Sequence, residues 1–164
     1  MGKPISRFKD VLKLVASVTI CQLAGSVGSV FTVSAIPNWY AGLNKPLFSP
    51  PNWVFGPVWI TLYLMLGVSL YLVWRRGLEE KKVKDAILVF EVQLLLNALW
   101  SIAFFGGKSP ITGLIVIALL WCAILLNIRR FWSISKTAAA LLGPYFLWVS
   151  FATILNLSIL LLNQ

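Results

Sequence analysis

Amide and aromatic side chains recur at helical spacing within residues 83–105, and they have the clearest capacity for chemistry in this chain. Successive members lie three or four positions apart, which places them on one face of a helix. Amides are costly in lipid unless they face a partner or a cavity. Two interpretations stay open: a cavity for a flat, partly polar ligand, or interhelical hydrogen bonds that only hold the helices together. The members are Phe90, Gln93, Asn97, Trp100 and Phe104, with Ser101 at the edge.

Two other apolar segments supply further aromatic side chains. Trp59 and Tyr63 are one helical turn apart, and a second set recurs at helical spacing near the C-terminus. We predict that Trp59 and Tyr63 face the amide stripe and Trp148 of the second set, and form a box for a planar apolar ligand with a few polar groups. The C-terminal set is Tyr145, Trp148, Ala152 and Leu155, in which the small Ala152 leaves room between large rings.

Several kinds of active site are excluded by residue type. The chain has no histidine, which excludes histidine acid–base catalysis, the usual zinc sites and haem ligation by a proximal histidine. Its five acidic residues lie mostly at one predicted membrane edge, so no carboxylate pair faces the predicted cavity. Neither a glycine-rich phosphate loop nor a serine nucleophile with a base is visible. We expect no metal site and no required cofactor.

Long apolar runs must position these side chains. The chain has 164 residues, of which 59% are apolar and only 12% charged, against roughly 25% charged in soluble domains. A spanning helix needs about 20 mostly apolar residues. The sequence therefore predicts one all-α integral membrane domain over residues 1–164, a bundle of five transmembrane helices. The predicted spans are residues 11–35, 52–74, 83–105, 110–131 and 136–162.

The first span begins after basic residues and could be mistaken for a secretory signal. Signal peptides have an apolar core of about 7–15 residues, whereas this run exceeds 20, so we expect a retained helix. Small residues recur along it at four-residue steps, which favours close packing inside the bundle or, alternatively, a homodimer interface. These residues are Ser17, Cys21, Gly25 and Ser29.

The basic residues are placed asymmetrically. The net charge is +9, and 12 of the 14 basic residues lie before the first span or at its edge, or in and beside the second and fourth connections. By the positive-inside rule, the N-terminus is predicted to be cytoplasmic. We interpret the charge as an orientation signal that also favours anionic lipid, and we expect no nucleic-acid partner. The 12 residues are Lys3, Arg7, Lys9, Lys13, Arg75, Arg76, Lys81, Lys82, Lys84, Arg129, Arg130 and Lys136.

The connection at residues 36–51 is rich in proline and aromatic residues. Pro37 and Pro46 restrict its backbone, and Pro51 suits the first turn of the following helix. Such a segment is unlike a flexible tether. It is predicted to form an ordered lid loop between the first two helices, across the mouth of the bundle.

Three motifs together resemble the TspO family of tryptophan-rich sensory proteins and mitochondrial translocator proteins. They read WYAGLNKPLFSPPNWVFGPVWITLY from Trp39, QLLLNALWSIAFFG from Gln93 and GPYFLWVSFATILN from Gly143. The resemblance implies a five-helix bundle, often dimeric, with a pocket under the first loop. It implies binding of porphyrins, haem-like tetrapyrroles and benzodiazepine-type drugs.

The resemblance also assigns roles to individual residues. Trp39 and Tyr40 match the aromatic pair of the loop, and Trp59 and Trp148 match tryptophans implicated in light-dependent porphyrin breakdown. The cholesterol-recognition pattern of mitochondrial members is absent, which favours a prokaryotic cell membrane. The other matched pocket residues are Gln93, Asn97, Trp100, Ala152 and Leu155.

Our leading hypothesis is a membrane sensor or receptor that binds protoporphyrin or a related tetrapyrrole. Because histidine is absent, a metal-free porphyrin is the favoured ligand. An enzyme that degrades porphyrin in light through Trp59 and Trp148 is the first alternative, and a porphyrin transporter is the second. A scaffold role would leave Gln93 and Asn97 without a ligand.

Overall fold

Five helices long and apolar enough to cross a membrane make up most of the described chain, which confirms the predicted all-α membrane class. The computed structural model describes residues 4–164, with side chains from Phe8 onward, so Lys3 and the side chain of Arg7 lie outside the described residues. The elements are α1 (Pro4–Ala35), η1 (Tyr40–Gly42), α2 (Asn52–Trp74), α3 (Lys81–Ser101), η2 (Ile102–Gly106), α4 (Pro110–Trp132), α5 (Lys136–Leu141) and α6 (Gly143–Leu162).

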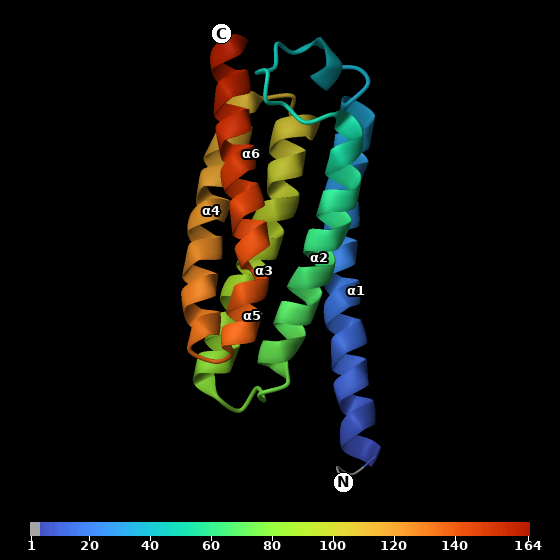
Figure 1. Cartoon of the computed structure of the whole chain (residues 1–164), viewed down its shortest axis with the longest axis vertical. Coiled ribbons are helices and arrows are strands. Elements are labelled where there is room, and N and C mark those ends of the chain that lie inside the picture. The colour runs from blue at the N-terminus through green and yellow to red at the C-terminus, as the bar shows by residue number, and fades with distance from the viewer. Residues whose placement is uncertain (1–3) are drawn as a thin grey trace.

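The helices form an elongated bundle in which α1 occupies an edge (Figure 1). Helix α1 packs against α2 and α3, whereas α4 packs against α3 and α6. The loop between α1 and α2, residues 36–51, lies at the same end as the C-terminus. The α2–α3 and α4–α5 connections, with the basic residues in and beside them, lie at the opposite end, as does the start of α1.

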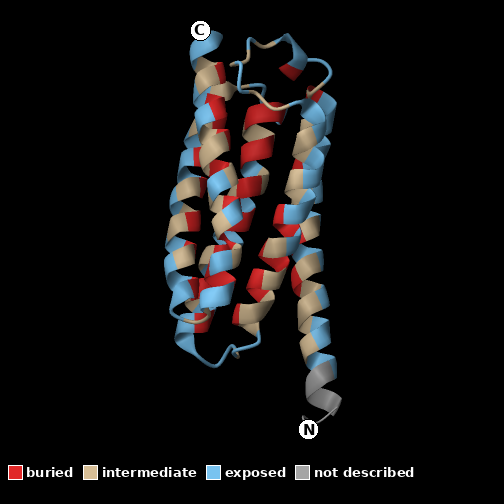
Figure 2. Cartoon of the chain, in the orientation of Figure 1, coloured by how far each residue is buried: buried red, intermediate tan, exposed pale blue. Residues whose placement is uncertain are grey.

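The outer faces of the helices are apolar. Large exposed hydrophobic side chains occur along every span, among them Leu23, Leu64, Leu95, Ile115 and Ile154. Figure 2 shows the buried residues turned toward the bundle interior and the exposed ones toward its outside. A water-soluble surface does not carry so much contiguous apolar area. Lipid is the environment that this surface fits.

The fifth span is interrupted at Leu142, between α5 and α6. Pro144 has no backbone N–H, so the Ala140 carbonyl loses its usual helical donor. The chain instead makes a tight turn, with the Leu142 N–H donating to Ala139 O at 3.1 Å, and then resumes its helix. Ser135 caps the start of α5 by accepting from the Ala138 N–H at 3.3 Å.

Helix α3 ends in a π-helical turn, η2, that widens the backbone. The Gly107 N–H donates to Ile102 O at 2.7 Å, five residues back. This widening brings two consecutive phenylalanines, Phe104 and Phe105, under the α1–α2 loop. Their ring centroids lie 5.3 Å and 6.5 Å from that of Trp39.

Three members of the small-residue ridge of α1, Ser17, Cys21 and Gly25, pack within the bundle, whereas Ser29 is exposed. Ser17 and Cys21 are fully buried. A Cβ at Gly25 would overlap the ring of Tyr63, and one at Gly67 would lie 2.6 Å from Val18 Cα. The backbones of α1 and α2 therefore come close at Gly67, as small residues allow in lipid.

Alanine substitution should separate the two kinds of glycine in α2. Gly67→Ala places a methyl group against the Val18 backbone and should lower the free energy of unfolding by about 1–3 kcal/mol. The matched control is Gly56→Ala, which meets no atom within 4 Å. It should be neutral or stabilise by up to about 1 kcal/mol. The free energy of unfolding of each variant, measured by reversible unfolding in mixed micelles, tests both expectations. Equal changes for Gly67→Ala and Gly56→Ala would contradict the close approach of α1 and α2 at Gly67.

Candidate functional site

A buried amide joins three helices at the centre of the bundle. The Tyr63 hydroxyl donates to Asn97 Oδ1 at 2.6 Å, and Asn97 Nδ2 donates to the Tyr145 hydroxyl at 2.6 Å. All three residues are buried. The interaction ties α3 to α2 and α6 and holds the Tyr63 ring in one orientation.

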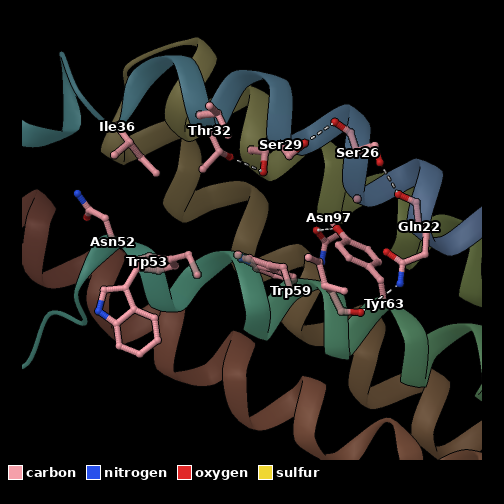
Figure 3. A pocket seen from close by; sticks show the side chains of 16 residues that line it. Gln22, Ser26, Ser29, Thr32, Ile36, Asn52, Trp53, Trp59, Tyr63 and Asn97 are labelled. Carbon is pink, nitrogen blue, oxygen red and sulfur yellow. Dashed lines mark hydrogen bonds between the residues drawn. The ribbon is translucent and has the colours of Figure 1, made fainter.

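A cleft of about 460 Å³ lies between α1 and α2, in the half of the bundle next to the α1–α2 loop. One wall carries Trp59 and Tyr63 from α2, and Asn97 and Ser101 from α3 also line it. Figure 3 shows Gln22, Ser26, Ser29 and Thr32 of α1 facing this space from the opposite side. Its volume falls in the range of roughly 300–1,000 Å³ that suits drug-sized ligands.

Trp59 is the centre of a group of aromatic rings at the cleft. Its centroid lies 5.6 Å from that of Tyr63 with the planes 31° apart, and 6.3 Å from that of Trp100. Tyr145 lies behind it at 6.4 Å. These neighbours restrict the indole to one orientation, so that the cleft has a rigid aromatic wall.

A second, much smaller cavity of about 20 Å³ lies deeper, under the loop. Three buried polar groups in this region, the Tyr40 hydroxyl and the Nε1 atoms of Trp100 and Trp148, have no hydrogen-bond partner among the described residues. Buried donors normally have partners. The residues lining this inner cavity are Tyr40, Phe55, Trp100, Phe104, Phe105, Ala152, Leu155, Asn156 and Ile159.

The structure thus divides the predicted site residues between two spaces. Trp59, Tyr63, Asn97 and Ser101 line the cleft, whereas Tyr40, Trp100, Ala152 and Leu155 line the inner cavity. Phe55 lines both.

Three predicted site residues line neither space. Gln93 is fully buried and accepts from Asn127 Nδ2 of α4 at 3.1 Å. Trp148 packs against Phe55, with centroids 6.1 Å apart, and Trp39 packs against the phenylalanines of η2.

The α1–α2 loop is held by polar contacts. Asn163 of the chain end accepts from the Asn44 N–H at 2.9 Å and donates to Asn44 O at 2.9 Å. Within the loop, Lys45 Nζ donates to Tyr40 O at 2.8 Å and to Leu43 O at 3.2 Å. Burial raises the pKa of the Tyr40 phenol.

The contribution of α1 to the cleft is absent from the sequence prediction. Gln22, Ser26 and Ser29 recur at steps of four and three, which is a helical-face signal of the same kind as the α3 stripe. Trp53, which resembles an interfacial belt residue, also lines the cleft although 75% of its surface is exposed.

Five spans and an aromatic- and amide-lined cleft between two of them define an integral membrane protein with a cleft of ligand size. The sequence model of the TspO/MBR family matches residues 17–162. The chain belongs to this family.

Named relatives come from archaea, bacteria and mammals. The chain is 46% identical over 155 residues to the tryptophan-rich protein TspO of Archaeoglobus fulgidus, covering 94% of this chain and 99% of that protein. It is 42% identical over 132 residues to the human translocator protein, covering 79% and 78%. It is 33% identical over 146 residues to the tryptophan-rich sensory protein of Cereibacter sphaeroides, covering 89% and 90%.

The Asn97 interaction generates a prediction about stability. Asn97→Leu leaves two buried tyrosine hydroxyls unpartnered and should lower the free energy of unfolding by about 1–3 kcal/mol. In a Tyr63→Phe/Tyr145→Phe background the same substitution should be neutral or stabilising, because no hydroxyl then loses a partner and a buried amide without its two partners is removed. The free energy of unfolding is measured by reversible unfolding of four proteins: the wild type, Asn97→Leu, Tyr63→Phe/Tyr145→Phe and the triple variant. Equal losses in both backgrounds would show that the amide does not act through the tyrosines.

Proposed function

We propose that this protein is a membrane receptor for a tetrapyrrole, with a metal-free porphyrin as the favoured ligand. The observation that carries the proposal is the cleft of about 460 Å³, which places the rings of Trp59 and Tyr63 beside the polar groups of Asn97 and Ser101. A flat apolar macrocycle fits an aromatic wall, and its polar atoms need a small number of hydrogen-bonding groups.

The opposite wall adds polar groups. Ser26 and Ser29 donate to carbonyls of their own helix, at 2.9 Å and 2.8 Å, and their hydroxyl oxygens can still accept. Asn52 lines the cleft near the α1–α2 loop, where a carboxylate arm would approach the membrane surface. The ligand would therefore lie with its apolar body in the cleft and its charged arms toward the loop.

The donors around the cleft favour recognition of the macrocycle over ligation of a metal. The lining side chains offer hydroxyl, amide, phenol and indole groups, whereas imidazole and thiolate, the usual strong iron ligands, are not among those described there.

We assign the α1–α2 loop the role of a lid over this site, at the non-cytoplasmic side of a prokaryotic cell membrane. Its ties to Asn163 and its ring contacts with η2 support a cover that stays in place. The gathering of basic residues at the other end of the bundle supports a cytoplasmic N-terminus. A homodimer would use another face than the buried Ser17 and Cys21.

Light-dependent porphyrin breakdown is the second candidate function, and the position of Trp59 favours it. A porphyrin in the cleft would contact this indole, which has Tyr63, Trp100 and Tyr145 as ring neighbours within 6.4 Å. Such a group of rings can share an oxidising equivalent. Trp148 would act only indirectly, because its recorded ring neighbours are Phe55 and Phe151.

Porphyrin binding should depend on Trp59. In the dark, protoporphyrin should quench the tryptophan fluorescence of the purified protein saturably. Trp59→Phe should weaken binding roughly 2- to 12-fold, because one aromatic contact contributes about 0.5–1.5 kcal/mol. The matched control is Trp132→Phe, at the far end of α4 and 55% exposed, which should bind like the wild type.

Absence of saturable quenching in the wild type would remove tetrapyrroles as ligands. Equal affinity of Trp59→Phe and the wild type would move the ligand away from the cleft. Illumination of the same samples tests the second candidate: a new product formed by the wild type and lost in Trp59→Phe would favour an enzyme, whereas equal fading in both would leave a receptor.

A further inference from the structure

We propose that the cleft between α1 and α2 is also the entrance of the site, so that its ligand arrives from within the bilayer and not from water past the α1–α2 loop. The proposal rests on the proposed function, because it concerns the route of the same membrane-soluble, planar ligand. Two observations carry it: the packing of α1 on α2 leaves the cleft open to the bilayer, and the contacts of the α1–α2 loop close the route from water.

The cleft opens on the outer surface of the bundle. Several of its lining residues are exposed, and they come from both helices at its mouth. Since this surface faces hydrocarbon, an apolar molecule dissolved in the bilayer reaches the mouth without crossing a polar layer. The exposed lining residues are Ser26, Ser29, Val33, Asn52, Trp53, Gly56 and Ile60.

The two helices separate toward the mouth from a point of close contact. At Gly67 the backbones of α1 and α2 leave no room for a methyl group, since a Cβ there would lie 2.6 Å from Val18 Cα. Nearer the loop, Gly56 has no atom within 4 Å of its Cβ position. One side-chain bond crosses between the helices in this region, from Gln22 Nε2 to Ile60 O at 3.1 Å.

Helix α1 is also the least embedded of the five spans. Only 17% of its apolar window is buried, against 28% to 44% in the other four. Its neighbours are α2, α3 and η2. A small displacement of α1 about the Gly67 contact would widen the cleft without disturbing the Asn97 interaction, which joins α2, α3 and α6.

The loop is the less accessible route. Asn163 holds Asn44 by two bonds of 2.9 Å, and Phe48 packs on Phe151 of α6 with centroids 6.2 Å apart. At the other end of the loop, Tyr40 lies 5.7 Å from Phe105 and is buried. Entry past the loop would break these contacts together, whereas entry through the cleft breaks none of them.

The decisive experiment locks the loop and times ligand entry. Asn44→Cys and Asn163→Cys are introduced into a Cys122→Ala background, which removes the exposed native thiol, and joined by a short bismaleimide. The protein is reconstituted in lipid vesicles that receive protoporphyrin in the dark. Stopped-flow quenching of tryptophan fluorescence gives the rate at which protoporphyrin associates with the protein. The rate at which protoporphyrin partitions into the bilayer is measured separately with protein-free vesicles. Mass spectrometry verifies the cross-link.

If entry is lateral, the cross-linked protein and an un-cross-linked control, the same double-cysteine protein capped with a monofunctional maleimide, should associate within twofold of each other. A fall of tenfold or more on cross-linking would overturn the proposal. That result differs from failure of the proposed function, in which the wild type would show no saturable quenching at any time.

A second variant fills the mouth of the cleft. Gly56→Phe should slow association and dissociation at least tenfold, while the matched control Gly42→Phe, in the loop and equally free of neighbours, should change neither rate by more than twofold. An unchanged rate in Gly56→Phe, or slowing only in Gly42→Phe, would overturn lateral entry. If Gly56→Phe abolishes binding, the association rate of the cross-linked protein becomes the test of lateral entry, because the cross-link alters no residue of the cleft.

Discussion

The hydrogen bonds of Asn97 are the constraint on which the site depends. An amide placed in the middle of a membrane span must be satisfied by other parts of the protein, because lipid offers no partner. Here both of its polar atoms are used, one by Tyr63 and one by Tyr145, at 2.6 Å each. These bonds fix the spacing of α2, α3 and α6. They also orient the Tyr63 ring that, with Trp59, forms the aromatic wall of the cleft.

Around these hydrogen bonds, the polar contacts between helices are distributed unevenly, in a way that suits ligand binding. Asn97 ties α2, α3 and α6 through its two hydrogen bonds, and the loop is tied to α6 and η2. Helix α1 lies outside this polar group: it packs closely on α2 at Gly67, and Gly25 lies against the Tyr63 ring beside the cleft. The polar ties therefore lie on the side that would recognise the ligand, whereas one side-chain hydrogen bond, from Gln22 to Ile60, crosses the side from which it would enter.

The class and the five spans could be predicted from the sequence, because run length and residue type determine them directly, and the family followed from the resemblance of three motifs. The roles of individual polar residues could not be separated in the same way. Gln93 and Asn97 share a helical face, yet Gln93 meets Asn127 of α4 while Asn97 borders the cleft. Which helix covers each turn depends on packing between spans. The same limit hid Gln22 and Ser26, since the small-residue ridge beside them gave α1 an equally good face to bury, and it hid the place of Ser29 in the cleft, since Ser29 belongs to that ridge.

A high-resolution structure of the protein with protoporphyrin bound, in lipid, tests the central claim most directly. The account predicts a macrocycle between α1 and α2, against the rings of Trp59 and Tyr63, with Asn97 still joined to both tyrosines. A porphyrin held elsewhere, with lipid chains in the cleft, would contradict it.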